Sequence, residues 1–180
     1  MNSPKLPSSD RLFGIAAFFI SVCTFFVYIY EARLLQKQQY ASALPYLEMW
    51  NSRPKPGIYK LILVNNGVGP AFIKDVKVHY QGKVYKGDHV HFYQTIIPRN
   101  ERVSFLNTDI PVGRAIPAGQ AIDLILLEGS LADADRVNNL FGDGPTKDTD
   151  KAKIEITYSS VYDETWRVLG MEGAPQKLDD

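Results

Sequence analysis

A run of 19 residues without a charged side chain, Leu12 to Tyr30, constrains this chain most. As a helix rising about 1.5 Å per residue, it would be roughly 28 Å long, close to the ~30 Å hydrocarbon core of a bilayer. Its apolar side chains, among them Leu12, Phe19 and Phe26, would favour insertion by roughly 3–7 kcal/mol before its few polar residues are counted. The run predicts one membrane-spanning helix, with Tyr30 at the headgroup level and Cys23 as a small apolar filler within the span.

Two other interpretations of this run fit less well. A cleaved signal peptide has a shorter apolar core and a small-x-small site soon after it, whereas the nearest such site, 41–43, lies far beyond Tyr30. A core helix of a soluble protein is rarely apolar on all sides over such a length. Lys5 and Arg11 precede the run and Arg33 and Lys37 follow it. The positive-inside rule therefore leaves the orientation open.

After Tyr30 the chain has no Gly or Pro until Pro45, so the helix is expected to continue as a stalk over 31–44. A coiled-coil spacing joins Val27, Tyr30, Leu34, Lys37, Ala41 and Leu44. Only about two heptads lie outside the span and Lys37 interrupts the seam, which favours a rigid spacer over a self-association stalk. Weak homo-oligomerisation through the span and stalk remains an alternative.

Residues 45–170 predict a mainly β domain, because short apolar runs alternate with Gly, Pro and Asn at spacings typical of antiparallel strands. We expect a β-sandwich, Ig-like or barrel-like, with one short helix over 131–141 capped by Ser130. Residues 1–11 and 171–180 are expected to be an N-terminal tail and a flexible C-terminal tail. The expected strands are 45–50, 58–64, 72–80, 83–85, 101–106, 121–127, 153–158 and 166–169, and 89–97 fits either a strand or a short helix.

The segment Asn65, Gly67, Gly69 and Pro70 breaks a strongly apolar strand and predicts a structural turn. Its glycines are expected to supply positive φ angles, and Pro70 to fix the direction in which the chain leaves.

The order of these features resembles a group of uncharacterised bacterial single-pass membrane proteins, which have an N-terminal anchor and a C-terminal β-sandwich-like domain. The resemblance rests on the single span, a Gln-rich helix ending at ASALPYL (41–47), a strand ending in NNGVGPA (65–71), and a closing hairpin, ITYSSVYDETW (156–166). It implies a bacterial inner-membrane location and supports the sandwich. The group has no assigned activity, so the resemblance supplies no catalytic residues.

Composition and motifs exclude several classes of function. The 20 Lys and Arg balance the 20 Asp and Glu, so the broad basic surface of a nucleic-acid-binding protein is not expected. A single Cys excludes an intramolecular disulfide scaffold. The chain has no Walker loop and no G-x-S-x-G, and the Gly67-Val68-Gly69 pair lacks the third glycine of a dinucleotide fingerprint. We therefore expect no catalytic residue and no cofactor.

Histidines and tyrosines supply the candidate binding residues. His89 and His91 would share one face if their segment is a strand, and with His79 or Asp88 they could bind a metal. Two solvent-facing histidines are the favoured interpretation, so no metal is expected. The acidic loop 143–150 lacks EF-hand spacing and is interpreted as solvated. The candidate binding surface comprises His89, His91, Tyr93 and Tyr162.

Together these features predict a non-catalytic module for protein interaction or sensing, anchored in the bilayer and facing a membrane-associated protein partner. The alternative is a membrane-tethered β-barrel that senses a small molecule and signals to its transmembrane helix. An enzyme is the least favoured class.

Overall fold

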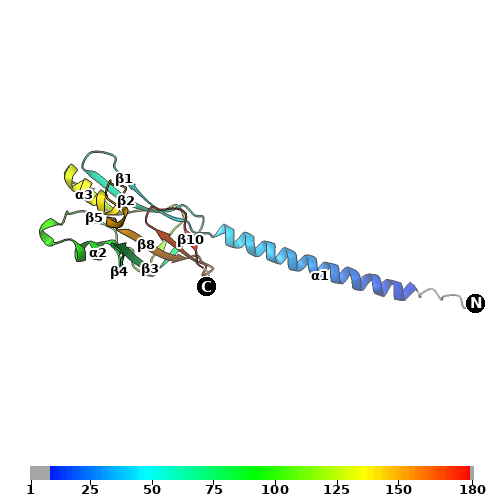
Figure 1. The fold of residues 1–180 in the computed structure, drawn as a ribbon. Helices are drawn as coiled ribbons and strands as arrows, with labels where there is room; N and C mark the ends of the chain where they lie inside the picture. The colour runs from blue at the N-terminus through cyan, green and yellow to red at the C-terminus, as the bar shows by residue number, and fades with distance from the viewer. Residues whose placement is uncertain (1–8, 179–180) are drawn as a thin grey trace, which may run out of the picture. The chain divides into compact units, whose positions relative to one another are not determined.

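The computed structural model describes residues 9–178 and divides the chain into two compact units, with the boundary between Ala41 and Ser42. The first unit contains the helix α1 (Ser9–Ser42), which is continuous over 34 residues (Figure 1). At about 1.5 Å per residue this corresponds to roughly 51 Å. The expected continuation of the helix beyond Tyr30 is therefore confirmed, and it ends two residues before the expected Leu44.

No residue in the apolar part of α1 is buried within the described structure, and the helix is long and apolar enough to cross a membrane. Its two internal hydroxyl groups are satisfied within the helix. Ser21 donates to the carbonyl oxygen of Ala17 at 2.9 Å and Thr24 donates to that of Ile20 at 2.8 Å. Such i to i−4 bonds remove the need for a polar partner outside the helix.

The second unit contains two antiparallel sheets, of four and six strands (Figure 1). The four-stranded sheet has the order β1 (Leu47–Ser52), β2 (Ile58–Asn65), β7 (Ala121–Glu128) and β5 (Leu106–Asn107). The six-stranded sheet has the order β10 (Gln176–Lys177), β9 (Thr165–Leu169), β8 (Lys153–Ser159), β3 (Ala71–Tyr80) and β4 (Lys83–Lys86), with β6 (Ala115–Ile116) also paired to β3.

The most apolar expected strands occupy interior positions of the sheets. In the four-stranded sheet β2 and β7 are direct neighbours, as their nearly continuous apolar sequences indicate. Gln81 and Gly82 form the tight turn that joins β3 to β4, and both residues have positive φ angles, 49° and 72°. This backbone matches the twist of the two strands that the turn connects.

The structure decides the open alternative at 89–97 and overturns the strand expected after it. Residues 89–96 form the helix α2 (His89–Ile96), so the helical alternative holds and the strand does not. The Asp88 side chain caps this helix by accepting a hydrogen bond from the backbone N–H of His91 at 2.9 Å. The expected strand 101–106 is also wrong. Its place is taken by the 3₁₀ helix η1 (Arg99–Glu101), irregular backbone and the two-residue strand β5.

The third helix, α3 (Leu131–Phe141), begins and ends where the sequence predicts. The Ser130 hydroxyl accepts a hydrogen bond from the backbone N–H of Asp133 at 3.1 Å, which confirms Ser130 as the N-cap. The C-terminal segment contains an unexpected strand, since Gln176 and Lys177 pair with β9 where the sequence indicates a frayed tail.

One hydrophobic core joins the two sheets and the helices α2 and α3. It contains the fully buried side chains of Tyr59, Tyr158, Phe92, Leu47, Leu61, Leu63, Ile73, Ile110, Ile116, Leu124, Ile125 and Leu127. Tyr158 of β8 links the six-stranded sheet to β1, because its hydroxyl accepts a hydrogen bond from the backbone N–H of Leu47 at 3.3 Å. Burial raises the pKa of Tyr158 to about 12, so this phenol is neutral at pH 7.

Candidate functional site

The predicted structural turn joins β2 to β3 and contacts residues 43–46, the segment through which the chain enters the β domain. Asn65 is fully buried, and its side-chain oxygen accepts hydrogen bonds from the backbone N–H groups of Tyr46 at 3.1 Å and Gly67 at 3.0 Å. Its amide nitrogen donates to the carbonyl oxygens of Gly69 and Ile116, each at 2.9 Å. All four polar positions of this buried amide are therefore satisfied within the domain.

The two glycines of this turn have a different use from the one expected. Neither Gly67 nor Gly69 has a positive φ angle. A Cβ atom on Gly67 would overlap the carbonyl oxygen of Leu44, and one on Gly69 would overlap that of Ala43. Glycine is needed here because the backbone that enters the domain passes in direct contact with the turn.

The four residues of the predicted binding surface do not form one surface. Because 89–96 is helical, His89 and Tyr93 face the core and are 0% and 6% exposed. His91 is exposed on the opposite face of α2. Tyr162 is 42% exposed in the connection between β8 and β9, on a different part of the domain. The prediction that His89 and His91 share a solvent-facing surface is wrong, since it depended on the alternation of a strand.

His89 is a core residue with one unsatisfied ring nitrogen. Its Nε2 donates to the carbonyl oxygen of Leu124 at 2.8 Å, and its buried Nδ1 has no partner among the described residues. Burial lowers the pKa of His89, and the Leu124 carbonyl together with Asp88 and Asp109 opposes this shift only in part. The imidazole is therefore neutral at pH 7. Within residues 9–178, no group of three or more His, Cys, Asp or Glu is placed to hold a metal ion.

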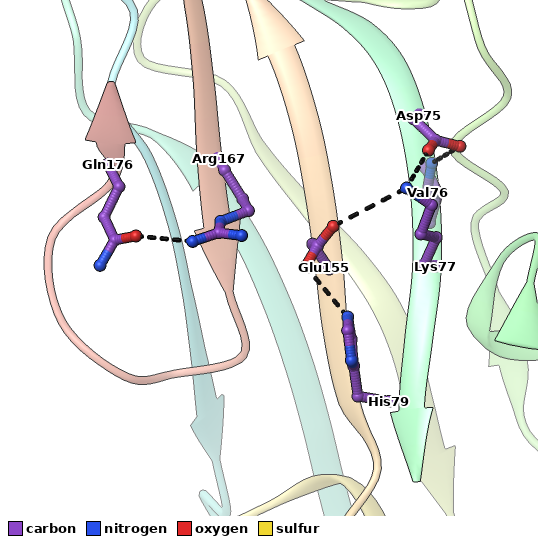
Figure 2. A network of polar contacts seen from close by, with 7 residues as sticks. All are labelled: Asp75, Val76, Lys77, His79, Glu155, Arg167 and Gln176. Atoms are coloured by element: carbon purple, nitrogen blue, oxygen red, sulfur yellow. Dashed lines mark hydrogen bonds and ion pairs between the residues drawn. The ribbon is translucent and has the colours of Figure 1, made fainter. Parts of the chain in front are cut away.

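A network of polar contacts on the six-stranded sheet was not singled out from the sequence (Figure 2). Glu155 of β8 lies opposite Lys77 of β3 in the strand register. The Nζ of Lys77 lies 2.6 Å from Oδ2 of Asp75 and 4.0 Å from Oε1 of Glu155, while Nε2 of His79 lies 3.0 Å from Oε2 of Glu155. The hydrogen bond to Asp75 raises the pKa of Lys77.

The sequence could place Lys77 and His79 together on the outward face, because they alternate with Val76 and Val78. The sequence alone could not predict that Glu155 lies beside them, because the pairing of β3 with β8 brings together residues 78 positions apart. Acidic and basic groups in this network compensate one another, since Lys77 and His79 both lie against carboxylates (Figure 2). The arrangement suits a solvated sheet face more than acid–base chemistry.

A concave site lies between the segment that follows α2 and the helix α3. We call it the α2–α3 pocket. It has a volume of about 430 Å³ and is lined by Tyr93, Ile97, Glu101, Val103, Arg136, Val137, Asn139 and Leu140. Only Tyr93 among these residues is predicted from the sequence, as part of an exposed surface. The other seven come from segments about 35 residues apart, and no local motif marks them.

Two further depressions of comparable size are open surface grooves. One, of about 490 Å³, lies beside β1 and includes Glu48, Trp50 and Met171. The other, of about 560 Å³, lies beside the start of β3 and includes Phe72, Val112 and Val161.

Comparison with known proteins gave no match to any family model, to any curated protein or to any solved structure.

Proposed function

We propose that this protein is a single-pass membrane protein whose helix α1 anchors a β-sandwich-like domain that serves in protein interaction or sensing, without catalysis. The observation that carries the proposal is that no residue in the apolar part of α1 is buried against the rest of the described structure. Leu12, Phe19, Phe26 and Tyr30 are each more than 60% exposed. An exposed apolar helix of this length requires an apolar environment, and a bilayer provides one.

The continuity of α1 supports an anchor over a cleaved leader. The helix passes the end of the apolar run without a break and reaches Ser42. The small-x-small sequence at 41–43 lies at the boundary with the β domain, where Ala43 contacts the β2–β3 turn closely. Cleavage there would cut the chain at the point where the domain holds it.

The filled core supports an interaction module over an enclosed ligand sensor. Large side chains such as Tyr59, Phe92 and Tyr158 occupy the space between the sheets and helices. The depressions described above are open to the surface, so a partner would be bound there and not inside a barrel. A small-molecule sensor is the second candidate, and the α2–α3 pocket is the observation in its favour.

We place the protein in a bacterial inner membrane on the strength of the sequence resemblance described above. The partner is then a membrane-associated protein, because a domain tethered to a surface meets other tethered proteins at a raised effective concentration. The span and stalk would allow a weak homo-oligomer. No feature of the balanced charge favours nucleic acid.

Membrane extraction tests the anchor. The full chain, expressed in bacteria, should remain in the membrane fraction at alkaline pH and be released by detergent. Placing Arg at both Phe19 and Phe26 should add roughly 5–7 kcal/mol to the insertion free energy and shift the protein to the soluble or degraded fraction. The matched control places Arg at Leu34 and Leu35, which lie in the stalk, and should leave the protein membrane-bound. Release of the unaltered chain at alkaline pH would contradict the proposal.

A compartment-sensitive reporter fused after Asp180 then determines on which side of the membrane the domain lies.

Cross-linking in intact membranes, followed by purification in detergent, tests for a partner. Recovery of the chain alone or with itself in place of a distinct membrane protein would contradict the interaction role.

A further inference from the structure

We propose that the α2–α3 pocket binds a small zwitterionic molecule with an apolar side chain, the chemistry of an apolar α-amino acid. This inference names the ligand class for the small-molecule sensor, the second candidate above, and does not depend on the membrane anchor.

The floor and walls of the pocket are apolar. Tyr93 and Val137 are buried at 6% and 1% exposure, and Ile97, Val103 and Leu140 are half-buried around them. The volume of about 430 Å³ lies in the lower part of the ~300–1,000 Å³ range of small-molecule sites. The pocket is therefore suited to one apolar group of modest size.

The wall formed by α2 and the segment after it is held by contacts of its own. The Tyr93 hydroxyl accepts a hydrogen bond from the backbone N–H of Val103 at 2.8 Å. The Arg102 guanidinium donates to the carbonyl oxygens of Ile97, at 2.8 Å, and Gln94, and so folds the segment after α2 back on itself. The Tyr93 ring packs edge-on against Phe105 with centroids 5.1 Å apart. In a preorganised pocket, ligand binding loses little conformational entropy of the side chains, because they are already ordered.

Three polar side chains border this apolar floor. Arg136 and Asn139 lie with Leu140 on one face of α3, because residues three and four apart are neighbours on a helix. Glu101 belongs to η1 in the opposite wall. Among the described residues, none of these three side chains has a hydrogen-bond or ion-pair partner. The adjacent carboxylate of Asp135 is already paired with Arg53 at 2.6 Å, so it does not neutralise Arg136.

These charges define the ligand. Arg136 would bind a carboxylate through two parallel N–H groups, and Glu101 would accept hydrogen bonds from an ammonium group. Asn139 can donate or accept beside Arg136. A molecule with both charges on one end and an apolar body on the other satisfies all three side chains while it covers the floor. A ligand with one charge would forgo the contact with either Arg136 or Glu101, both of which are exposed.

Calorimetric titration of the full chain in detergent micelles tests the proposal with three related compounds. L-phenylalanine should bind saturably, whereas 3-phenylpropionate lacks the ammonium group and phenethylamine lacks the carboxylate. Each of these two compounds should bind about tenfold more weakly than L-phenylalanine.

Two exposed rim variants assign the charges. Arg136→Gln should weaken L-phenylalanine about tenfold and leave phenethylamine unchanged, and Glu101→Gln should weaken L-phenylalanine similarly and leave 3-phenylpropionate unchanged. The matched control is Arg99→Gln, an exposed position in the same 3₁₀ helix that does not line the pocket, and it should bind like the unaltered chain. Circular dichroism checks that each variant is folded. Absence of saturable binding at millimolar L-phenylalanine, equal binding of the three compounds, or rim variants that bind like Arg99→Gln would overturn the proposal.

Discussion

Tyr59, His89 and Trp166 each bury one polar atom that has no hydrogen-bond partner among the described residues. Burial raises the pKa of the Tyr59 phenol and lowers that of the His89 imidazole, so both groups are held in their neutral forms. Of the two, only His89 titrates near physiological pH in the unfolded chain. Its ionisation therefore links the stability of the domain to pH.

Stability should fall as the pH decreases below about 6.5 because of His89. Above that pH, His89 is neutral in both the folded and the unfolded state. Below it, His89 binds a proton in the unfolded state, whereas burial keeps it neutral in the folded state. The free energy of unfolding then decreases by about 1.4 kcal/mol per pH unit until the lowered folded pKa is reached. Urea denaturation at pH 7.5 and 5.5, followed by tryptophan fluorescence, measures this change.

His89→Gln should reduce the pH dependence while keeping a donor for the Leu124 carbonyl. His91→Gln is the control, since His91 is exposed on the same helix. Equal pH dependence in the unaltered chain and in His89→Gln would show that another group is responsible.

Replacement of Asn65 should strongly lower the free energy of unfolding of the domain. Asn65→Ala removes four hydrogen bonds and leaves buried backbone groups without partners, so we expect a loss of about 3 kcal/mol or more in the free energy of unfolding. Asn66→Ala is the control, because Asn66 is exposed and its side chain donates only to Glu48. It should cost less than about 1 kcal/mol in the same urea titration.

At the scale of elements, a strong apolar pattern, either on one face or nearly continuous, is sufficient to predict the type and position of a helix or strand. The sequence therefore predicts α3 with its cap, and β2, β3, β7 and β8 to within a few residues. The sequence did not determine whether residues 89–97 form a helix or a strand, because HVHFYQTII has apolar residues at both helical and strand spacings. The cap from Asp88 and the burial of His89, Phe92 and Tyr93 together select the helix.

The candidate sites were less predictable than the elements. The α2–α3 pocket exists only because α2 is a helix and the segment after it folds back through Arg102. Once 89–97 is assigned to a strand, Tyr93 points to the wrong side and the pocket is not formed. The Lys77–Glu155–His79 contacts likewise require a strand register that turn chemistry alone does not specify.

The β2–β3 turn should not accept a side chain at Gly69. Gly69→Ala would place a methyl group against the backbone of Ala43, and we expect a loss of about 1–3 kcal/mol from the resulting displacement. Gly129→Ala is the control, because its nearest neighbour would be the Leu127 side chain at 3.5 Å and its φ angle is not positive. A Gly69→Ala domain as stable as the control would contradict this role of the turn.

At the scale of the whole molecule, the chain combines an apolar helix with a domain of balanced charge. The single cysteine, Cys23, lies in the middle of the apolar run of α1 and is exposed within the described structure. Its chemical accessibility therefore reports the environment of the helix directly. In water it would react as an exposed thiol, and in a bilayer it would be shielded from polar reagents.

A membrane-impermeant maleimide should not label Cys23 in intact membranes and should label it after denaturation in detergent. Asn100→Cys in a Cys23→Ser background is the positive control, since Asn100 is exposed in η1. In sealed vesicles, the side from which Asn100→Cys is labelled also gives the orientation. Rapid labelling of Cys23 in intact membranes would show that α1 does not cross the bilayer.

The contact between the incoming chain and the β2–β3 turn has a mechanical consequence. The carbonyl oxygen of Leu44 accepts hydrogen bonds from the N–H groups of Val68 at 2.9 Å and Gly69 at 3.2 Å, only two residues after α1 ends. The turn joins β2 of one sheet to β3 of the other. A pull on the chain at Leu44 is therefore carried directly into the turn that connects the two sheets.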